Sequence, residues 1–553
     1  MTDSFAAFRR RATPADRERF DQLRAISAQY SSLVLRGPGV TPLGAYRTIL
    51  ARLDEERQEL EKQISRNSVG LQAELRPITV EQVQAAIPGG AALVELFQYY
   101  PLNPKAGNPT KHWGKARYVV YVVPHRGDIV WTDLGEAAVI EQAVEKLLST
   151  LRRAAADPEP AARALDALVM QPIRRLLGET RWVFLSPDGA LNLVPFAALR
   201  DEEGHYLVER YAFTYLPSGR DLVRLGTSSP SPQRPVILAA PDFGAAAGPA
   251  PAPTTTNQRS AEMGSRSFGP LAFAAEEGQA LGRQLPDAKV LMGIEATESA
   301  VKALRGPRLL HIATHGFFLP DQPELPSPSL RDLGGGARTL DGMMRPTPYS
   351  ENPLLRSGLV FAGVNQGKSG NDDGVLTALE ASQLDLYGTK LVVLSACETG
   401  VGQVRSGDGV YGLRRALVMA GAETQVMSLW RVNDEATRVQ MEAYYGGLLA
   451  GGGRSEAMRQ VQLAMLHSSE RAHPYYWASF IVSGNPAALD GKAVVPEFAR
   501  VTPGMRGCGC EVRMSSRRDA ATWLTALSAL GLMRLRRRRD RFAMHYGREG
   551  EAP

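Results

Sequence analysis

Residues 390–400 read KLVVLSACETG, an apolar run that ends in Cys397 and reaches Gly400. A second run of the same kind, RLLHIATHGFF, spans residues 308–318 and leads into His315 and Gly316. Short, continuously apolar runs are typical of strands that are buried on both faces of a parallel sheet. The two runs therefore predict two strands of an α/β sheet, each followed directly by a chemically active side chain.

Further apolar, β-rich runs occur along most of the chain after residue 80. They are Ala92–Leu96, Tyr118–Val123, Trp182–Leu185, Val236–Ala239, Val290–Met292, Gln425–Leu429 and Phe480–Val482. Amphipathic helical stretches separate most of them, namely Ala138–Arg153, Glu276–Gln284, Gly412–Ala420, Glu435–Leu449 and Ser455–His467. Strands that alternate with helices predict α/β units and a mostly parallel sheet with helices on both faces.

The first 79 residues read as a helical hairpin. Thr13 and Pro14 form a favourable N-cap and first-turn pair for a helix over Pro14–Leu35. A Gly-Pro-Gly triplet at 37–39 ends this helix, and a second helix is predicted over Leu43–Ser65. No period of about 34 residues recurs, so we expect one hairpin that packs on the body rather than a repeat array.

Two Pro- and Gly-rich stretches, 244–270 and 319–352, are predicted to be mobile loops. Loops of this length inside a compact domain are usually functional lids or disordered insertions. The second loop follows His315 closely in the sequence. We therefore expect it to cover a site at the end of that strand.

Composition excludes several classes of protein. The chain of 553 residues is 44% hydrophobic and 22% charged, which is ordinary for a globular protein. Its net charge of +6 is misleading, because residues 500–553 carry twelve arginines and five acids, which leaves −1 for residues 1–499. We therefore expect no nucleic-acid partner. Three cysteines make no disulfide scaffold, and no secretory signal is visible, so a cytoplasmic location is expected.

His315 and Cys397 are the candidate catalytic residues. Sites in open α/β sheets form beyond the carboxyl ends of the strands, so the two side chains share a rim if their strands are neighbours. An imidazolium lowers the pKa of a nearby thiol, and the imidazole then delivers the proton to a leaving amine. Backbone N–H groups of Gly316 and Cys397 would form the oxyanion hole. Against this stands the common case of a cysteine that is only a small buried apolar residue. His311, within the strand, is predicted to be a core histidine.

The strings LLHIATHGFF and LVVLSACETG closely resemble signatures of the CHAT family, caspase-like cysteine peptidases of the separase and caspase clan. VFLSPDGALNLVPFAAL (183–199), NPLLRSGLVFAG (352–363), GVLTALEASQLDL (374–386), GDGVYGLRRALVMAGAETQVMSLWRVNDEAT (407–437) and HPYYWASFIVSGNP (473–486) look like the same domain. The resemblance covers about residues 80–488. It implies a caspase-like α/β sandwich in which a silent half (80–230) precedes a catalytic half (231–488). It also implies that His315 and Cys397 are the catalytic dyad, with no metal or other cofactor.

Three residues near the cysteine are candidates for the substrate pocket. Asp408 either lines the pocket or caps a helix over Val410–Ala420. Leu429-Trp430 and Asp434 resemble the corresponding stretch of separase, in which an acid one helical turn later selects basic substrates. The present chain has Arg438 there, so we do not expect that preference to carry over. An acidic or apolar preference is one alternative, and a solvated Arg438 is the other. For the group that orients His315, Glu380 and Asp434 are equal candidates.

The basic tail, residues 489–553, allows three interpretations. Its Gly-Cys-Gly-Cys at 507–510, semi-apolar stretch and arginine cluster resemble the C-terminal sorting tags of myxobacterial surface proteins. Alternatively, residues 520–541 bind weakly to a membrane surface, which would make the protein envelope-associated, or the tail is simply flexible.

These observations predict a CHAT-type cysteine endopeptidase that cleaves a partner protein and has a regulatory or defence role by analogy. CHAT domains often follow tetratricopeptide arrays that sense a partner, whereas only one helical hairpin is visible here, so we expect either a separate activating protein or a chain that begins late in a longer gene. The alternative from another class is a catalytically silent caspase-like scaffold that acts as an interaction module.

Overall fold

Strands β8 (Leu309–Ala313) and β12 (Leu391–Ser395) lie side by side and run parallel in an eleven-stranded sheet. In the computed structural model of the chain, the described residues are 13–67, 78–103, 112–225, 230–245, 267–271, 273–319, 352–396, 403–405, 409–430, 433–496 and 498. They all belong to one compact unit, residues 1–500.

The order of the strands in the large sheet is β3-β2-β1-β4-β5-β16-β15-β12-β8-β6-β7. The remaining bounds are β1 (Ala91–Tyr99), β2 (Arg117–Pro124), β3 (Val130–Glu136), β4 (Trp182–Ser186), β5 (Ala212–Tyr215), β6 (Val236–Pro241), β7 (Lys289–Gly293), β15 (Thr424–Ser428) and β16 (Phe480–Gly484). Neighbouring strands are parallel except at β1–β2, β2–β3 and β15–β16. The predicted α/β fold with a mostly parallel sheet is therefore confirmed.

The apolar runs fold as strands because both faces of the sheet are covered. Leu391 and Val393 of β12 belong to the apolar core on one face, while Val392 and Leu394 belong to the core on the other. All four side chains are fully buried. Burial on both faces removes the hydrophobic and polar alternation that a half-exposed strand would show.

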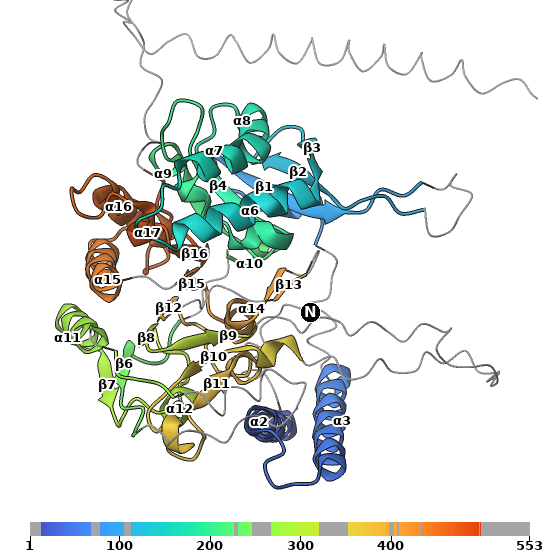
Figure 1. Cartoon of the computed structure of the whole chain (residues 1–553), viewed down its shortest axis with the longest axis vertical. Coiled ribbons are helices and arrows are strands. Elements are labelled where there is room, and N and C mark those ends of the chain that lie inside the picture. Colours follow the sequence, from blue (N-terminus) through green and yellow to red (C-terminus); the bar gives the residue numbers. More distant parts are fainter. Residues whose placement is uncertain are drawn as a thin grey trace, which may run out of the picture. The chain divides into compact units, whose positions relative to one another are not determined.

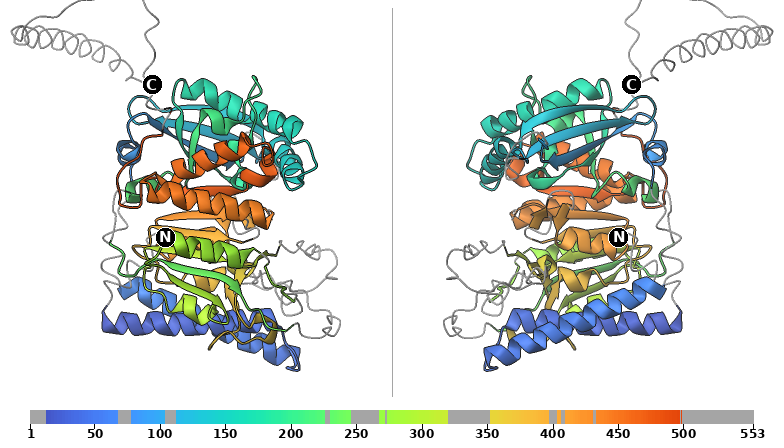
Figure 2. Two further views of the ribbon diagram at one scale, coloured as in Figure 1. Left: turned by 90° about the vertical axis from the view of Figure 1, so that its left-hand side faces the viewer. Right: turned by 90° about the vertical axis from the view of Figure 1, so that its right-hand side faces the viewer.

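Helices cover the two faces of the sheet in separate layers (Figures 1 and 2). One layer contains α6 (Ala137–Leu151), α7 (Glu159–Leu168), α8 (Met170–Leu177), α11 (Ala274–Gln284), α15 (Asp434–Leu449), α16 (Arg454–Leu466) and α17 (Pro474–Trp477). The other contains α5 (Val80–Ala86), α10 (Asp221–Leu225), α12 (Glu298–Lys302), α13 (Ala378–Ala381) and α14 (Leu413–Met419). A further short helix, α9, spans Leu207–Arg210.

A small antiparallel sheet follows the end of β8. Its strands are β9 (Gly316–Phe318), β10 (Ser357–Val360) and β11 (Val375–Thr377), in the order β11-β10-β9. Gly358 allows this close pairing, because a Cβ there would lie 2.6 Å from the Leu376 carbonyl oxygen and 2.7 Å from the Phe317 ring. Strands of three or four residues carry little periodic signal, and the sequence did not predict this sheet.

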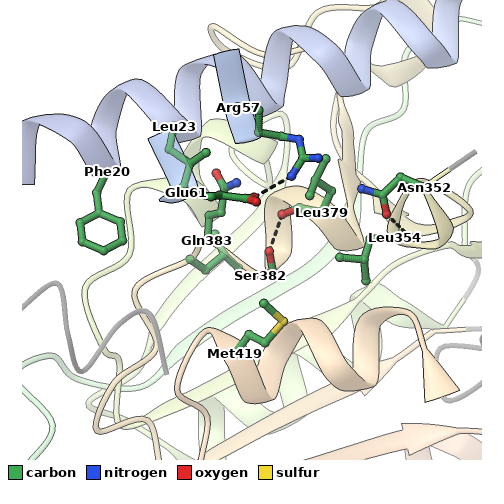
Figure 3. A pocket seen from close by; sticks show the side chains of 11 residues that line it. Phe20, Leu23, Arg57, Glu61, Asn352, Leu354, Leu379, Ser382, Gln383 and Met419 are labelled. Carbon is green, nitrogen blue, oxygen red and sulfur yellow. Dashed lines mark hydrogen bonds and ion pairs between the residues drawn. The ribbon is translucent and has the colours of Figure 1, made fainter. Parts of the chain in front are cut away.

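The N-terminal helices α2 (Pro14–Arg36) and α3 (Leu43–Asn67) form the predicted hairpin, and the Thr13 side chain caps α2 by accepting a hydrogen bond from the Asp16 N–H. Ser31 of α2 lies 3.2 Å from Thr377, at the start of α13, between their hydroxyl oxygens. An open pocket of about 630 Å³, which includes space open to solvent, lies between these helices and the body. Figure 3 shows Arg57 of α3 bound to Glu61 beside it. The hairpin is therefore docked on the half of the molecule that carries β8 and β12.

Two details differ from the prediction or lie beyond the described residues. The helix expected over Val410–Ala420 begins only at Leu413, because Gly409–Tyr411 forms strand β14 and pairs with β13 (Gln403–Arg405). Valine and tyrosine favour this extended pairing. Most of both predicted loops, and residues 499–553 of the tail, lie outside the described residues. Among the described helices, none is long and apolar enough to cross a membrane.

Candidate active site

In the sequence, His315 and Cys397 follow two neighbouring strands. The parallel register of β8 and β12 pairs Ala313 with Ser395, and each candidate follows its strand's paired residue by two positions. Cys397 lies outside the described residues, but its covalent link to Ala396 keeps their Cα atoms about 3.8 Å apart. Neighbouring strands are only about 4.8 Å apart, so the described ends of β8 and β12 lie at one edge of the sheet, and a shared rim for His315 and Cys397 stays a prediction.

The His315 imidazole is held by a backbone carbonyl and two aromatic rings. Its Nε2 lies 2.9 Å from the Gly269 carbonyl oxygen, so this nitrogen carries the proton and donates it in the hydrogen bond. The ring centroids of Phe243 and Phe268 lie 5.1 and 5.7 Å from that of His315. With Nε2 engaged, the Nδ1 lone pair is the ring position that can accept a proton.

Asn365 fixes the segment that carries this carbonyl. Its side-chain Oδ1 accepts a hydrogen bond from the Phe268 N–H, and its Nδ2 donates to the Phe268 carbonyl oxygen, both at 2.9 Å. A second bond from Nδ2 reaches the Gly244 carbonyl oxygen, also at 2.9 Å. The sequence pointed to neither Gly269 nor Asn365, since a backbone carbonyl in a Gly- and Pro-rich loop leaves no motif.

Of the two side chains proposed to orient His315, Glu380 is bound to other residues. Glu380 is buried and accepts hydrogen bonds from the Thr377 hydroxyl at 2.7 Å and the Lys302 ammonium at 2.9 Å. Burial is the main reason that the pKa of Glu380 is raised. Asp434 lies at the first turn of α15. Glu380 is therefore engaged away from His315, whose Nε2 is bound by the Gly269 carbonyl, and the proposal for Asp434 stays a prediction.

His311 is a core histidine, as predicted. It is 1% exposed, and its Nδ1 lies 3.2 Å from the Tyr445 hydroxyl oxygen. On its other side, Nε2 lies 3.2 Å from Oε1 of Glu277, whose Oε2 accepts a hydrogen bond from the Ser395 hydroxyl at 3.0 Å. This buried network links α11 and α15 to the end of β12, two residues before Cys397.

Of the remaining predicted site residues, Gly316 and Arg438 are described by the structure and Asp408 is not. Gly316 is the first residue of β9 and pairs with Leu359, and its oxyanion role stays a prediction. Asp408 lies outside the described residues. Arg438 is bound on the surface of α15, where its guanidinium donates to Glu442 at 2.7 Å and lies 3.7 Å from Glu276.

A pocket of about 450 Å³ adjoins the rim. Thr314 and Ala396, the residues directly before His315 and Cys397, both line it, as does Asp434. Arg438 does not line it. Of the two alternatives for Arg438, its ion pairs fit a surface residue, and an effect on substrate preference stays a prediction.

One group of side chains in the described residues has the spacing of metal ligands. Ligand atoms of Asp201, Glu203 and His205 lie within 4.8 Å of one another. Arg210 already neutralises Asp201 through a bond of 2.7 Å. The cluster is therefore an arginine-bound loop rather than a strong cation site.

The described residues form a mostly parallel sheet with helices on both faces, and His315 follows one of its central strands. The family model named CHAT domain matches residues 159–485, which is more than half of the chain, and the chain belongs to this family. The match begins at the first residue of α7, so the predicted boundary near residue 80 stays a prediction.

The chain is also similar to named proteins and solved structures. It is 29% identical over 373 residues to Tetratricopeptide repeat protein 28 of Homo sapiens and 29% identical over 366 residues to that of Mus musculus. These matches cover 63% and 62% of the chain and 14% of each relative, about one seventh of its length. The Saccharomyces cerevisiae separase–securin complex aligns at 13% identity and a TM-score of 0.32, over 86% of this chain and 27% of that one. Porphyromonas gingivalis RgpB aligns at 10% identity and a TM-score of 0.34, over 64% and 78%.

Proposed function

We propose that the chain is a CHAT-type cysteine endopeptidase. His315 takes the Cys397 proton at Nδ1, and the thiolate attacks the peptide carbonyl carbon of a bound substrate. The C–N bond breaks as the imidazolium returns the proton to the leaving amine, which leaves a thioester on Cys397. Water, deprotonated by the same imidazole, then hydrolyses the thioester and frees the thiol. The backbone N–H groups of Gly316 and Cys397 are the proposed donors to the oxyanion.

This proposal rests on the register of β8 and β12 taken together with the fixed orientation of the His315 imidazole. The register pairs Ala313 with Ser395, so His315 and Cys397 follow at matching positions. The Gly269 carbonyl holds Nε2–H, which leaves Nδ1 as the base. A fixed tautomer and ring orientation are what a base beside a thiol requires.

We propose a protein as the substrate, cut at one or a few sites, and a second protein as the activator. The curated relatives are named for tetratricopeptide repeats, and the chain covers about one seventh of their length. The hairpin α2–α3 is docked on the catalytic half. A separate protein that engages the hairpin is a route by which activity could be controlled.

Thiol labelling at neutral pH tests the proposed chemistry. The intact chain and His315→Ala would be treated with iodoacetamide, and modification of Cys397 would be followed by peptide mass. Cys508 and Cys510 serve as reference thiols in the same sample. We expect Cys397 to react at least about 10-fold faster than the reference thiols in the intact chain, and at a similar rate to them in the variant.

The second candidate is a catalytically silent interaction module, which the repeat-containing relatives favour. In that case labelling of Cys397 would be slow and independent of His315. Capture of a partner through the hairpin would then be the next experiment, and slow, His315-independent labelling that persists with the captured partner bound would reject the peptidase.

A further inference from the structure

The last turn of α2 reaches the apolar side chains that surround His315. Leu35, one residue before the end of this helix, is 4% exposed. It belongs to a buried cluster, here called the Phe243 cluster, whose other members are Phe243, Phe317, Leu319 and Val360. Among the described residues, Leu35 is the hairpin's one contribution to this cluster. A side chain of the N-terminal hairpin is therefore part of the packing beside the candidate histidine.

The Phe243 cluster holds His315 through its backbone and through its ring. The Val360 N–H donates to the His315 carbonyl oxygen at 3.1 Å, and the Val360 carbonyl oxygen accepts the Thr314 hydroxyl at 2.5 Å. The Phe243 ring centroid lies 5.1 Å from that of the imidazole. The backbone of Phe243 is itself fixed, because its carbonyl oxygen accepts the Asn365 N–H at 3.0 Å. The side chain of Phe243 then depends on the apolar neighbours that pack around it.

The same cluster supports the segment that binds the imidazole Nε2. Phe268 is partly buried and packs against the cluster, with its ring centroid 6.3 Å from that of Phe243 and 5.7 Å from that of His315. Phe268 directly precedes Gly269, whose carbonyl oxygen accepts the Nε2–H bond. A change in the packing of the cluster therefore acts on the imidazole ring and on its acceptor together.

The residue before Leu35 packs into a different cluster. Val34 is 2% exposed and lies with Tyr46 and Leu50 of α3 and with Leu355 and Leu379 of the body. Adjacent residues in one helical turn thus have separate tasks. Val34 joins the two helices of the hairpin to the body, while Leu35 enters the packing around His315. The chain therefore offers a matched pair of buried apolar side chains for an experiment.

We infer that Leu35 is a positioning residue for His315, which acts by holding the Phe243 cluster in place against the imidazole. Truncation of a buried leucine leaves a cavity that the surrounding side chains fill only in part. The aromatic rings beside His315 then gain freedom, and the imidazole loses its fixed distance to the Gly269 carbonyl. The inference rests on the proposed function for the catalytic role of His315. It deepens that function, because it makes the docked end of α2 a condition for an oriented base.

The tautomer of His315 can be measured directly by NMR. The chain has eight histidines, so labelling with ¹⁵N at histidine alone gives few signals, and His315→Gln identifies the relevant pair. At about pH 8.5, where a free imidazole is neutral, we expect the intact chain to carry the ring proton on Nε2. In Leu35→Ala the preference for this tautomer should fall about 10-fold, roughly the contribution of one hydrogen bond, and the two nitrogen signals should move towards each other. Val34→Ala should keep the signals of the intact chain.

Two results would overturn the inference. The first is a set of His315 ring signals that Leu35→Ala leaves unchanged, and the second is an equal loss of the tautomer in Val34→Ala. Leu35→Met conserves the volume of the side chain and should retain the preference of the intact chain. If circular dichroism shows that Leu35→Ala does not fold, Leu35→Val takes its place beside Val34→Ala, and the same two results decide.

Iodoacetamide labelling of Cys397 in the same proteins separates this inference from the proposed function. If labelling depends on His315 but Leu35→Ala leaves the ring signals unchanged, the peptidase stands and the positioning role is rejected. If labelling is independent of His315 even with a captured partner bound, while the tautomer is lost in Leu35→Ala alone, the peptidase is rejected and Leu35 still positions the imidazole.

Discussion

The His315 imidazole and the Gly269 backbone are joined by a hydrogen bond of 2.9 Å between Nε2 and the carbonyl oxygen. A carbonyl fixes the tautomer and the orientation of the ring, as the aspartate of a triad does, but it adds no net charge. The orienting group thus depends on the conformation of one short loop segment. That segment, in turn, is fixed by the side chain of Asn365.

Asn365→Ala is expected to slow the labelling of Cys397 without unfolding the protein. The substitution removes both hydrogen bonds to the Phe268 backbone, so the Gly269 carbonyl loses its fixed position. We expect the iodoacetamide rate at Cys397 to fall about 10-fold, and the free energy of unfolding to fall by about 1–3 kcal/mol. Gln366→Ala, at the exposed neighbouring residue, is the control and should change neither quantity. An unchanged labelling rate in Asn365→Ala would show that the loop does not position the imidazole.

Adjacent buried tyrosines on α15 should respond differently to loss of their hydroxyl groups. The Tyr445 hydroxyl lies 3.2 Å from His311 Nδ1, so Tyr445→Phe leaves a buried nitrogen unpaired and should cost about 1–2 kcal/mol. The Tyr444 hydroxyl is buried and has no hydrogen-bond partner in the described part of the chain. Tyr444→Phe should therefore be neutral or stabilising by up to about 1 kcal/mol. Urea denaturation of the two variants measures the difference, and equal losses would contradict the network around His311.

The fold could be predicted from the sequence because its central strands are buried on both faces. Continuous apolar runs such as Leu391–Ser395 leave no other stable placement, and the intervening helices have clear amphipathic periods. The environment of the site could not be predicted in the same way. Gly269 acts through a backbone atom, and Asn365 contacts a segment about one hundred residues away. Glu277 meets Ser395 and His311 only after three separate elements have packed together.

The stability of the protein should depend on pH because Glu95 on β1 is a buried carboxyl group. Burial raises the pKa of Glu95 to about 7 from its ordinary 4.5, so between these values the folded chain holds a proton that the unfolded chain has released. Its stabilising contribution is present below about pH 4.5 and is lost as the pH rises through 7. We expect Glu95 to lower the free energy of unfolding by about 1–2 kcal/mol between pH 5 and pH 8, after allowance for its partial exposure to water.

Glu95→Gln tests this dependence, because the amide mimics the protonated acid and its oxygen can still accept the Gly219 N–H. The variant should match the parent near pH 5 and exceed it in stability at pH 8. Some pH dependence of the same sign should persist, since burial also raises the pKa of Glu298 to about 8. A variant that loses as much stability between pH 5 and pH 8 as the parent would contradict the assignment.

Arg414 at the start of α14 is a buried cation whose removal should stabilise the protein. It is 4% exposed, and none of its guanidinium nitrogens has a hydrogen-bond partner within the described residues. Its charge lies over the Tyr215 ring, 5.6 Å from the centroid, and burial lowers its pKa to about 10. A single aromatic face recovers only part of the cost of removing a charge from water. Arg414→Met should therefore raise the free energy of unfolding by about 1–3 kcal/mol.

Arg454→Met is the matched comparison, because Arg454 is just as buried but has partners. Its guanidinium donates to the Thr424 hydroxyl at 2.8 Å and lies 3.4 Å from Glu423. Its loss leaves those groups without a donor and should cost about 2 kcal/mol or more, although Lys390 still binds Glu423. If hydrogen-bond partners decide whether a buried arginine stabilises the fold, the two substitutions should change the free energy of unfolding in opposite directions. Thermal and urea unfolding of the two variants measure both changes. A destabilised Arg414→Met would mean that the guanidinium stabilises the fold through its contact with Tyr215 or through groups beyond the described residues.

Because natural sequences retain such unpaired charges mainly at functional sites, Cys397 labelling should be measured in the same Arg414→Met sample. A more stable variant with slower labelling would place Arg414 among the groups that support the thiol.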